Sequence, residues 1–275
     1  MRTYISIDME GVAGVVHADH CRRGAADFEL ARHWMTAEAN AAALGAFDAG
    51  AAHVLVNDSH GDMRNLLLDE LDERVEILSG SLKPHSMVAG VDAGFDVALF
   101  VGYHAGAGTA LAILDHTYAG RVAASVRING RPFNEAGLNA LVCGQHQTPV
   151  GLVTGDETTC IQSAELIDGI ETVAVKRALS RYSAQSQHPK TARARIRAAA
   201  TRVCRRAGEL RPFVVDGPLL LETDCVTSAM ADACELLPKT VRASARTLRY
   251  QAPDPATLLS VLRAWMLLGA STIPA

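Results

Sequence analysis

The 275-residue chain lacks several features that would place it in a common class of protein. No uninterrupted apolar stretch reaches the about 20 residues that a membrane-spanning helix needs. The first residues pass directly into a strand-like run, without a long apolar segment and a small-residue cleavage site. Basic residues are not in excess, since the formal net charge is −4, which argues against nucleic acid or an anionic membrane as the main partner. We therefore expect a soluble, cytoplasmic protein.

Two further absences bear on the chemistry of the protein. The six cysteines form no C-x-x-C pair, so we expect reduced and mostly buried thiols, not disulfides or thiolate metal ligands. The sequence has no G-x-x-x-x-G-K-[ST] motif, and no G-x-G-x-x-G follows an expected strand, so nothing supports a nucleotide site. Any metal ligands must therefore come from histidine, aspartate and glutamate.

What the sequence does contain is a pair of carboxylates at the end of its first apolar run, residues 4–7. Asp8 and Glu10 stand two positions apart, and alternate side chains of an extended segment point to the same side. Divalent metal ions favour such oxygen ligands. Taken alone, the pair is equally well explained by a structural role, in which Asp8 caps a turn and Glu10 begins a helix.

The order of aliphatic and helical segments predicts an α/β fold with three layers and a mostly parallel sheet. Residues 53–58 and 97–103 are aliphatic runs typical of buried parallel strands, and helical periodicity covers residues 25–48. Toward the end of the chain, the composition shifts to a polar segment, a basic helix and short mixed elements. We therefore predict a metal-binding catalytic domain over residues 1–180. A smaller α+β part over residues 181–275 would pack on the site or cover it.

Histidines follow two of the expected strands: His60 comes after the second aliphatic run and His104 after the third. The carboxyl ends of parallel strands lie along one edge of a sheet, so both histidines should meet Asp8 and Glu10 there. Two histidines and two carboxylates at equivalent strand ends predict a metal site.

Two more candidates lie later in the chain. His116 follows a loop of small residues, where it could transfer a proton or stabilise an oxyanion. Glu135 stands in the first turn of an expected helix. It either complements the helix dipole or supplies a further metal carboxylate, and the sequence alone leaves both roles open.

The separated motifs resemble those of the DppA-type D-aminopeptidases, the M55 family of zinc metallopeptidases. Residues 6–11, Ser-Ile-Asp-Met-Glu-Gly, resemble the S-x-D-x-E-G signature of that family. The similarity continues in the same order through further motifs: Val56-Asn57-Asp58-Ser59-His60, Ser79-Gly80 with Lys83-Pro84, Gly102-Tyr103-His104-Ala105, and Arg131-Pro132 through Glu135 to Gly137-Leu138-Asn139-Ala140.

The resemblance implies hydrolysis of short peptides or amides with an N-terminal D-amino acid, in a homo-oligomer that is a ring-shaped decamer. It also implies two zinc ions per chain, with metal ligands and a catalytic histidine at these positions: Asp8, Glu10, His60, His104 and Glu135 for the metals, and His116 for catalysis. Asp8 is the natural bridge, because one carboxylate can bind one ion through each oxygen. Two neighbouring ions would activate a water and polarise the scissile carbonyl, so no protein nucleophile is required. His116 then either donates to the oxyanion, which is the role we favour at this point, or shuttles a proton.

Two other functions remain open at this point. The same metal site would serve an M55-like amidase or esterase acting on an L-aminoacyl or specialised metabolite substrate. A non-catalytic peptide-binding protein linked to dipeptide transport would use the cluster only structurally, although such a module needs no second metal carboxylate. The stereochemistry of the substrate depends on the shape of the pocket, and the ligands suit zinc, manganese and cobalt alike.

Overall fold

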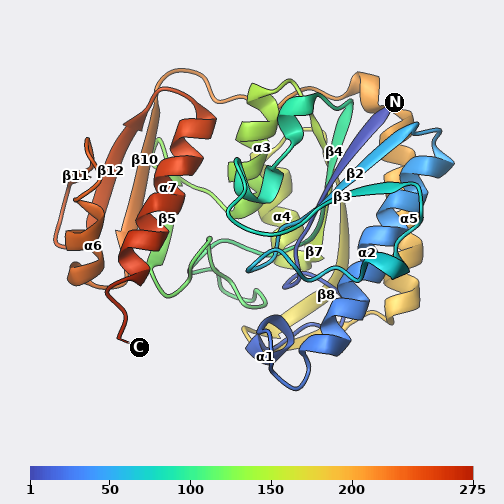
Figure 1. The fold of residues 1–275 in the computed structure, drawn as a ribbon, viewed down its shortest axis with the longest axis horizontal. Helices are drawn as coiled ribbons and strands as arrows, with labels where there is room; N and C mark the ends of the chain where they lie inside the picture. The colour runs from blue at the N-terminus through green and yellow to red at the C-terminus, as the bar shows by residue number, and fades with distance from the viewer. Residues whose placement is uncertain (275) are drawn as a thin grey trace.

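A seven-stranded sheet forms the centre of the larger part of the molecule in the computed structural model, which describes residues 1–274 (Figure 1). The strand order is β3-β2-β1-β4-β7-β8-β9, and all neighbours are parallel except β9, which pairs antiparallel with β8 at the edge. Its strands are β1 (Arg2–Ile7), β2 (His53–Asp58), β3 (Val75–Leu78), β4 (Val97–Tyr103), β7 (Val150–Asp156), β8 (Glu171–Ser180) and β9 (Ser183–Ser186). The predicted mostly parallel sheet is confirmed.

Helices cover both faces of this sheet and complete the three layers (Figure 1). Side chains alternate between the two faces along each strand, so that Tyr4 of β1 packs toward α3 and Ile5 packs toward α2 and α5. The helices are α2 (Phe28–Asp48) with α5 (Pro189–Arg205) on one face, and α3 (Glu135–Gln145) with α4 (Glu157–Leu166) on the other. Four short 3₁₀ turns lie in the connections: η1 (Leu68–Glu70), η2 (Ser86–Val88), η3 (Val91–Ala93) and η4 (Ala207–Glu209).

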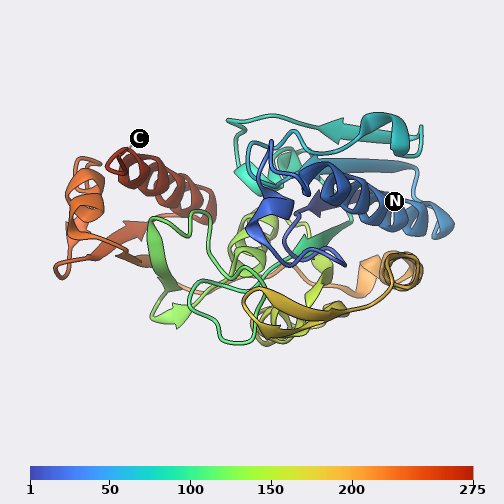
Figure 2. The same ribbon diagram turned by 90° about the horizontal axis from the view of Figure 1, so that it is seen from below.

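A smaller antiparallel sheet lies on the side of α3 away from the main sheet (Figures 1 and 2). Its strand order is β11-β12-β10-β5-β6, and α6 and α7 pack together against it. The elements are β5 (Ala123–Ile128), β6 (Arg131–Pro132), β10 (Leu219–Cys225), α6 (Ser228–Cys234), β11 (Val241–Arg242), β12 (Thr247–Ala252) and α7 (Pro255–Ala270). Helix α7 also contacts α3, so it lies between the small sheet and the body of the molecule.

The two sheets do not divide the chain at residue 180. The division into parts 1–180 and 181–275 stays a prediction. β5 and β6 lie in the smaller sheet although they come early in the chain, whereas β9 and α5 belong to the larger unit. The polar composition of residues 183–186 belongs to an exposed edge strand, because such a strand has one side in water.

Two expectations from the composition concern helices and cysteines. No helix within residues 1–274 is long and apolar enough to cross a membrane. All six cysteines are free thiols, and five of them are buried, as predicted from the absence of paired cysteine motifs.

Candidate metal centre

The carboxyl ends of β1, β2 and β4 lie side by side. Ile7, the last residue of β1, is level with Asp58 of β2 and Val101 of β4. The backbone pairing continues just past the strand, where Asp8 N donates to Val101 O at 2.9 Å. The residues that follow these strands therefore converge in one buried cluster: Asp8 and Glu10 after β1, His60 after β2 and His104 after β4.

Asp8 lies between the two histidines and presents one carboxylate oxygen to each. Its Oδ1 is 3.2 Å from His60 Nδ1, and its Oδ2 is 3.4 Å from His104 Nε2. On the first side, Glu10 Oε2 lies 2.9 Å from the same nitrogen of His60. On the second side, Glu135 Oε1 lies 3.4 Å from His104 Nε2. Two groups, each with one histidine and two carboxylates, thus share Asp8.

Backbone carbonyls orient both histidines. His60 Nε2 donates to Cys21 O at 2.8 Å, and His104 Nδ1 donates to Ala105 O at 3.0 Å. A carbonyl only accepts, so these nitrogens carry protons, and His60 Nδ1 and His104 Nε2 are the atoms turned toward the carboxylates. His104 Nε2 is buried and has no hydrogen-bond partner among residues 1–274. An unpaired buried nitrogen beside two carboxylates fits a metal ion.

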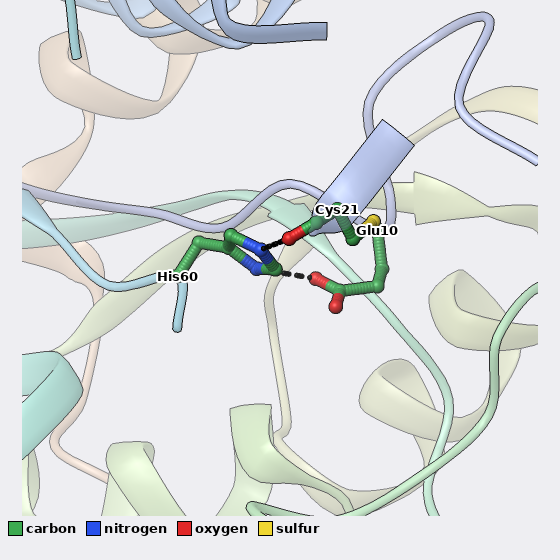
Figure 3. Close-up of side chains that lie close together, drawn as sticks. All are labelled: Glu10, Cys21 and His60. Carbon is green, nitrogen blue, oxygen red and sulfur yellow. Dashed lines mark hydrogen bonds and ion pairs between the residues drawn. The ribbon is translucent and has the colours of Figure 1, made fainter. Parts of the chain in front are cut away.

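Figure 3 shows the first side of the cluster, where Cys21 of α1 (Ala18–Cys21) lies beside Glu10 and His60. One possible ligand atom from each of these three residues lies within 4.8 Å of the other two. Burial, together with the charges of Glu10 and Asp8, raises the pKa of the Cys21 thiol. Cys21 could not be predicted from the sequence, because no spacing rule connects it to the strand ends.

The carboxylates shift the pKa values of the groups around them. Burial and the nearby charge of Glu10 raise the pKa of Asp8 to about 7. Burial by itself would lower the pKa of His104, but the charges of Glu135 and Asp8 outweigh it and raise this pKa to about 10. The cluster therefore stabilises positive charge strongly in a buried place, which is the property that a site for divalent cations needs.

His116 lies on the long connection between β4 and β5, on the second side of the cluster. Its ring stacks on that of His104, its Nδ1 donates to Leu114 O at 2.8 Å, and its Nε2 lies 3.9 Å from Glu135 Oε1. The His116 side chain is 22% exposed, whereas that of His104 is 1% exposed. His116 lines a cavity of about 340 Å³ that also reaches Asp8. The structure thus brings all six predicted site residues to one place.

The cavity has walls that the sequence did not predict. Helix α7 contributes Arg263, Met266 and Leu267, and the loop before η2 contributes Leu82. Tyr118 also lines the cavity, and its backbone N–H donates to Glu135 Oε1 at 2.6 Å, which fixes that carboxylate.

A buried hydroxyl network lies beneath the carboxylates and explains several motif residues. Ser6 Oγ lies 2.7 Å from each of Ser59 Oγ, Tyr103 Oη and the carbonyl oxygen of Met87. Tyr103 Oη also accepts from Asn139 Nδ2 at 3.1 Å. The network ties the ends of three strands to α3, so the ligand positions are held relative to one another.

Two motif glycines let the backbone of the first loop pass close to β4. A Cβ on Gly11 would lie 1.9 Å from Tyr103 O, and one on Gly102 would lie 2.3 Å from Asp8 O. Gly102 also has a φ of +66°, which side chains rarely allow. Any larger residue at either position would push the carboxylate loop away from the strand that carries His104.

Fold and site together define an α/β protein of the metal-dependent hydrolase class, with its chemistry at the carboxyl ends of parallel strands. Comparisons with known proteins agree. The model of the M55 peptidase family, described as D-aminopeptidase, matches residues 1–264. The chain belongs to this family, which confirms the resemblance predicted from its motifs and the predicted class of enzyme.

One relative by sequence and one solved structure are similar to this chain over nearly its whole length. A D-aminopeptidase of Bacillus subtilis (strain 168) is 34% identical over 255 residues, which are 92% of each chain. A solved structure described as the Zn-dependent D-aminopeptidase DppA from Bacillus subtilis, a self-compartmentalizing protease, matches with a TM-score of 0.95 at 32% identity, and all of both chains is covered.

Proposed function

We propose that the protein is a dizinc aminopeptidase that hydrolyses short peptides or amides with an N-terminal D-amino acid. The observation that carries the proposal is the position of Asp8, which offers one oxygen to each of two groups of possible metal ligands. The relatives supply the substrate class and the metal, since they are described as D-aminopeptidases and one of them as Zn-dependent.

Asp8, Glu10 and His60 would hold one ion, and Asp8, His104 and Glu135 would hold the other. Nitrogen and oxygen ligands suit zinc, and three protein ligands for each ion leave positions open for water and substrate. When bound, the two ions supply Lewis-acid polarisation of the scissile carbonyl and a water of lowered pKa.

We assign the proton transfer to His116. Its Nδ1–H is engaged by Leu114 O, and burial together with the charge of His104 lowers its pKa. The neutral ring therefore presents a lone pair on Nε2, the atom on the side of Glu135. Such a ring accepts a proton from the attacking water first and then gives it to the leaving amine. Of the two roles open from the sequence, this geometry favours the shuttle over a standing donor to the oxyanion.

We also propose how the subunits assemble, which part of the chain covers the site and where in the cell the protein lies. DppA from Bacillus subtilis is described as self-compartmentalizing, from which we infer that this chain also works as a homo-oligomer. A ring of ten subunits and a cytoplasmic location stay predictions. Arg263 and Leu267 of α7 line the cavity, which supports a covering role for the C-terminal part.

A paired assay tests the proposal. Zinc-loaded protein is given D-Ala-D-Ala or L-Ala-L-Ala, each with and without a chelator, and free amino acid is followed. We expect cleavage of the D-peptide alone, and its loss with chelator. Cleavage of neither peptide by protein that holds its metals would contradict the proposal and favour the amidase or esterase alternative. Binding of the D-peptide without turnover would favour the binding-protein alternative.

A further inference from the structure

Arg263 of α7 lines the same cavity as Asp8 and His116 and is the only arginine or lysine among the described lining residues. Its Nη1 donates to Lys83 O at 2.8 Å, and it forms no ion pair within residues 1–274. Other partly buried arginines of the small sheet and its helices behave differently. Arg127 pairs with Glu222 and Asp224, for example, through contacts of 2.6 and 2.8 Å.

A guanidinium that is partly buried without a carboxylate beside it has lost hydration that no charge replaces. Its planar fork of donors matches a carboxylate group in two parallel hydrogen bonds. Arg263 uses one nitrogen for Lys83 O, so further N–H groups are available to a ligand in the cavity.

The size of the cavity limits which carboxylate can meet Arg263. Its volume of about 340 Å³ is at the lower end of small-molecule sites. An extended dipeptide is only about 7 Å long, so a peptide with its scissile bond at the metal ligands ends within the same cavity. The described lining residues other than the metal-ligand cluster, His116 and Arg263 are uncharged, with Met87 and Met266 among them, and offer no second cation.

We propose that Arg263 binds the terminal α-carboxylate of a short peptide substrate and so makes the enzyme prefer dipeptides to amides of the same N-terminal residue. This inference rests on the proposed peptidase function and deepens it, because it assigns the recognition of the other end of the substrate. Arg263 acts in specificity here, while the chemical step belongs to the cluster and His116.

The test compares two substrates that share their first residue, D-Ala-D-Ala and D-alanine amide, which has no carboxylate. Arg263→Gln removes the charge but keeps an N–H donor for Lys83 O. In zinc-loaded protein, it should lower kcat/KM for the dipeptide about 10- to 100-fold, chiefly through KM, because a hydrogen bond to a charged group is lost. Hydrolysis of the amide should change less than about twofold. Arg197→Met, which breaks the exposed pair of Arg197 on α5 with Asp48 at the end of α2, is the control and should change the hydrolysis of neither substrate.

Arg263→Lys keeps the charge without the fork and should give an intermediate loss for the dipeptide alone; it also serves if the glutamine variant does not fold. Equal losses for both substrates, or no loss, would overturn the assignment of Arg263 while the peptidase function stands.

Calorimetric measurement of substrate binding separates the proposed carboxylate site from the proposed peptidase function. If wild type cleaves neither substrate, but Arg263→Gln weakens binding of the dipeptide and not of the amide, the function fails and the carboxylate site stands. If neither binding changes, both fail.

Discussion

The imidazole rings of His104 and His116 stack face to face, with centroids 4.0 Å apart and planes inclined by 10°. Two positively charged rings would repel each other at this distance, so we expect the two histidines to have different roles. His104 lies at 3.4 Å from Asp8 and from Glu135, where we propose that it serves as a metal ligand, and His116 faces the cavity with its pKa lowered by burial and by the charge of His104.

Alanine substitutions at these two positions should therefore separate metal binding from catalysis. His116→Ala should keep two zinc ions per chain and lower kcat about 10²- to 10⁴-fold, the usual contribution of a proton-transfer group. His104→Ala should lose about one zinc ion, because Nε2 would no longer be present between Asp8 and Glu135. Zinc per chain by atomic emission and kcat on D-Ala-D-Ala are the measurements. Loss of zinc from the His116 variant would contradict this division of roles.

Cys21 should not be a metal ligand, although its thiol lies near Glu10 and His60. A fourth protein ligand would close a site that must stay open for water and substrate. Cys21→Ala should therefore hold two zinc ions, and its cobalt-substituted form should have the same near-ultraviolet absorption as wild type. A thiolate-to-cobalt charge-transfer band in wild type that disappears in the variant would assign Cys21 to the metal.

Lys176 supports the loop that carries Glu10. Its buried Nζ donates to the carbonyl oxygens of Glu10, Val12 and Val15 at 2.5, 2.9 and 2.6 Å. Lys176→Met should lower the free energy of unfolding by about 3 kcal/mol or more, because three buried acceptors lose their donor. Zinc affinity should fall as well, since Glu10 loses its backbone support.

Urea denaturation and zinc titration measure the two effects of Lys176→Met. Lys190→Met, at an exposed lysine near the start of α5, is the matched control and should change neither value. A Lys176 variant with wild-type stability would mean that the loop satisfies its carbonyls without the ammonium group.

Glu38 of α2 should make stability depend on pH. Its Oε1 accepts from Ala13 N at 2.9 Å, and its Oε2 is buried without a partner among residues 1–274. Burial raises its pKa from 4.5 to about 7. Between these values the folded protein keeps a proton that the unfolded chain has released. The stabilising contribution is therefore complete below pH 4.5 and is lost as the pH rises to about 7.

Glu38→Gln has no proton to lose and isolates this effect. From pH 5 to pH 8, the free energy of unfolding of wild type should fall by about 2.5 kcal/mol relative to the variant. Urea denaturation of both zinc-loaded proteins at several pH values measures the difference. A difference that is constant over this range would show that Glu38 ionises at its ordinary pKa.

The sequence predicted the parts of the site that depend on strand order alone. Aliphatic runs that end in polar residues locate Asp8, His60 and His104, because parallel strands place their carboxyl ends at one edge. Glu135 could be assigned to the metal only by family resemblance. Its carboxylate reaches His104 because the connection after β4 brings Tyr118 N against it, and the course of that connection is set by tertiary packing.

Cys21 and Arg263 could not be predicted for the same reason. Cys21 reaches the cluster through a short helix with no signal of its own, and Arg263 lies on α7, far along the chain. Residues 183–186 were interpreted as part of a polar segment where composition shifts, but they form the edge strand β9 of the main sheet. Hydrophobic periodicity and composition describe single segments of the chain. The positions of these residues depend instead on contacts between segments that are far apart in the sequence.

Diffraction from crystals of zinc-loaded protein, measured on both sides of the zinc absorption edge, shows whether Asp8 joins two metal ions. We expect two anomalous peaks about 3.5–4 Å apart that flank the Asp8 carboxylate. One peak should lie beside Glu10 and His60, and the other beside His104 and Glu135. A single peak, or two peaks that do not share Asp8, would show that Asp8 does not bridge two ions.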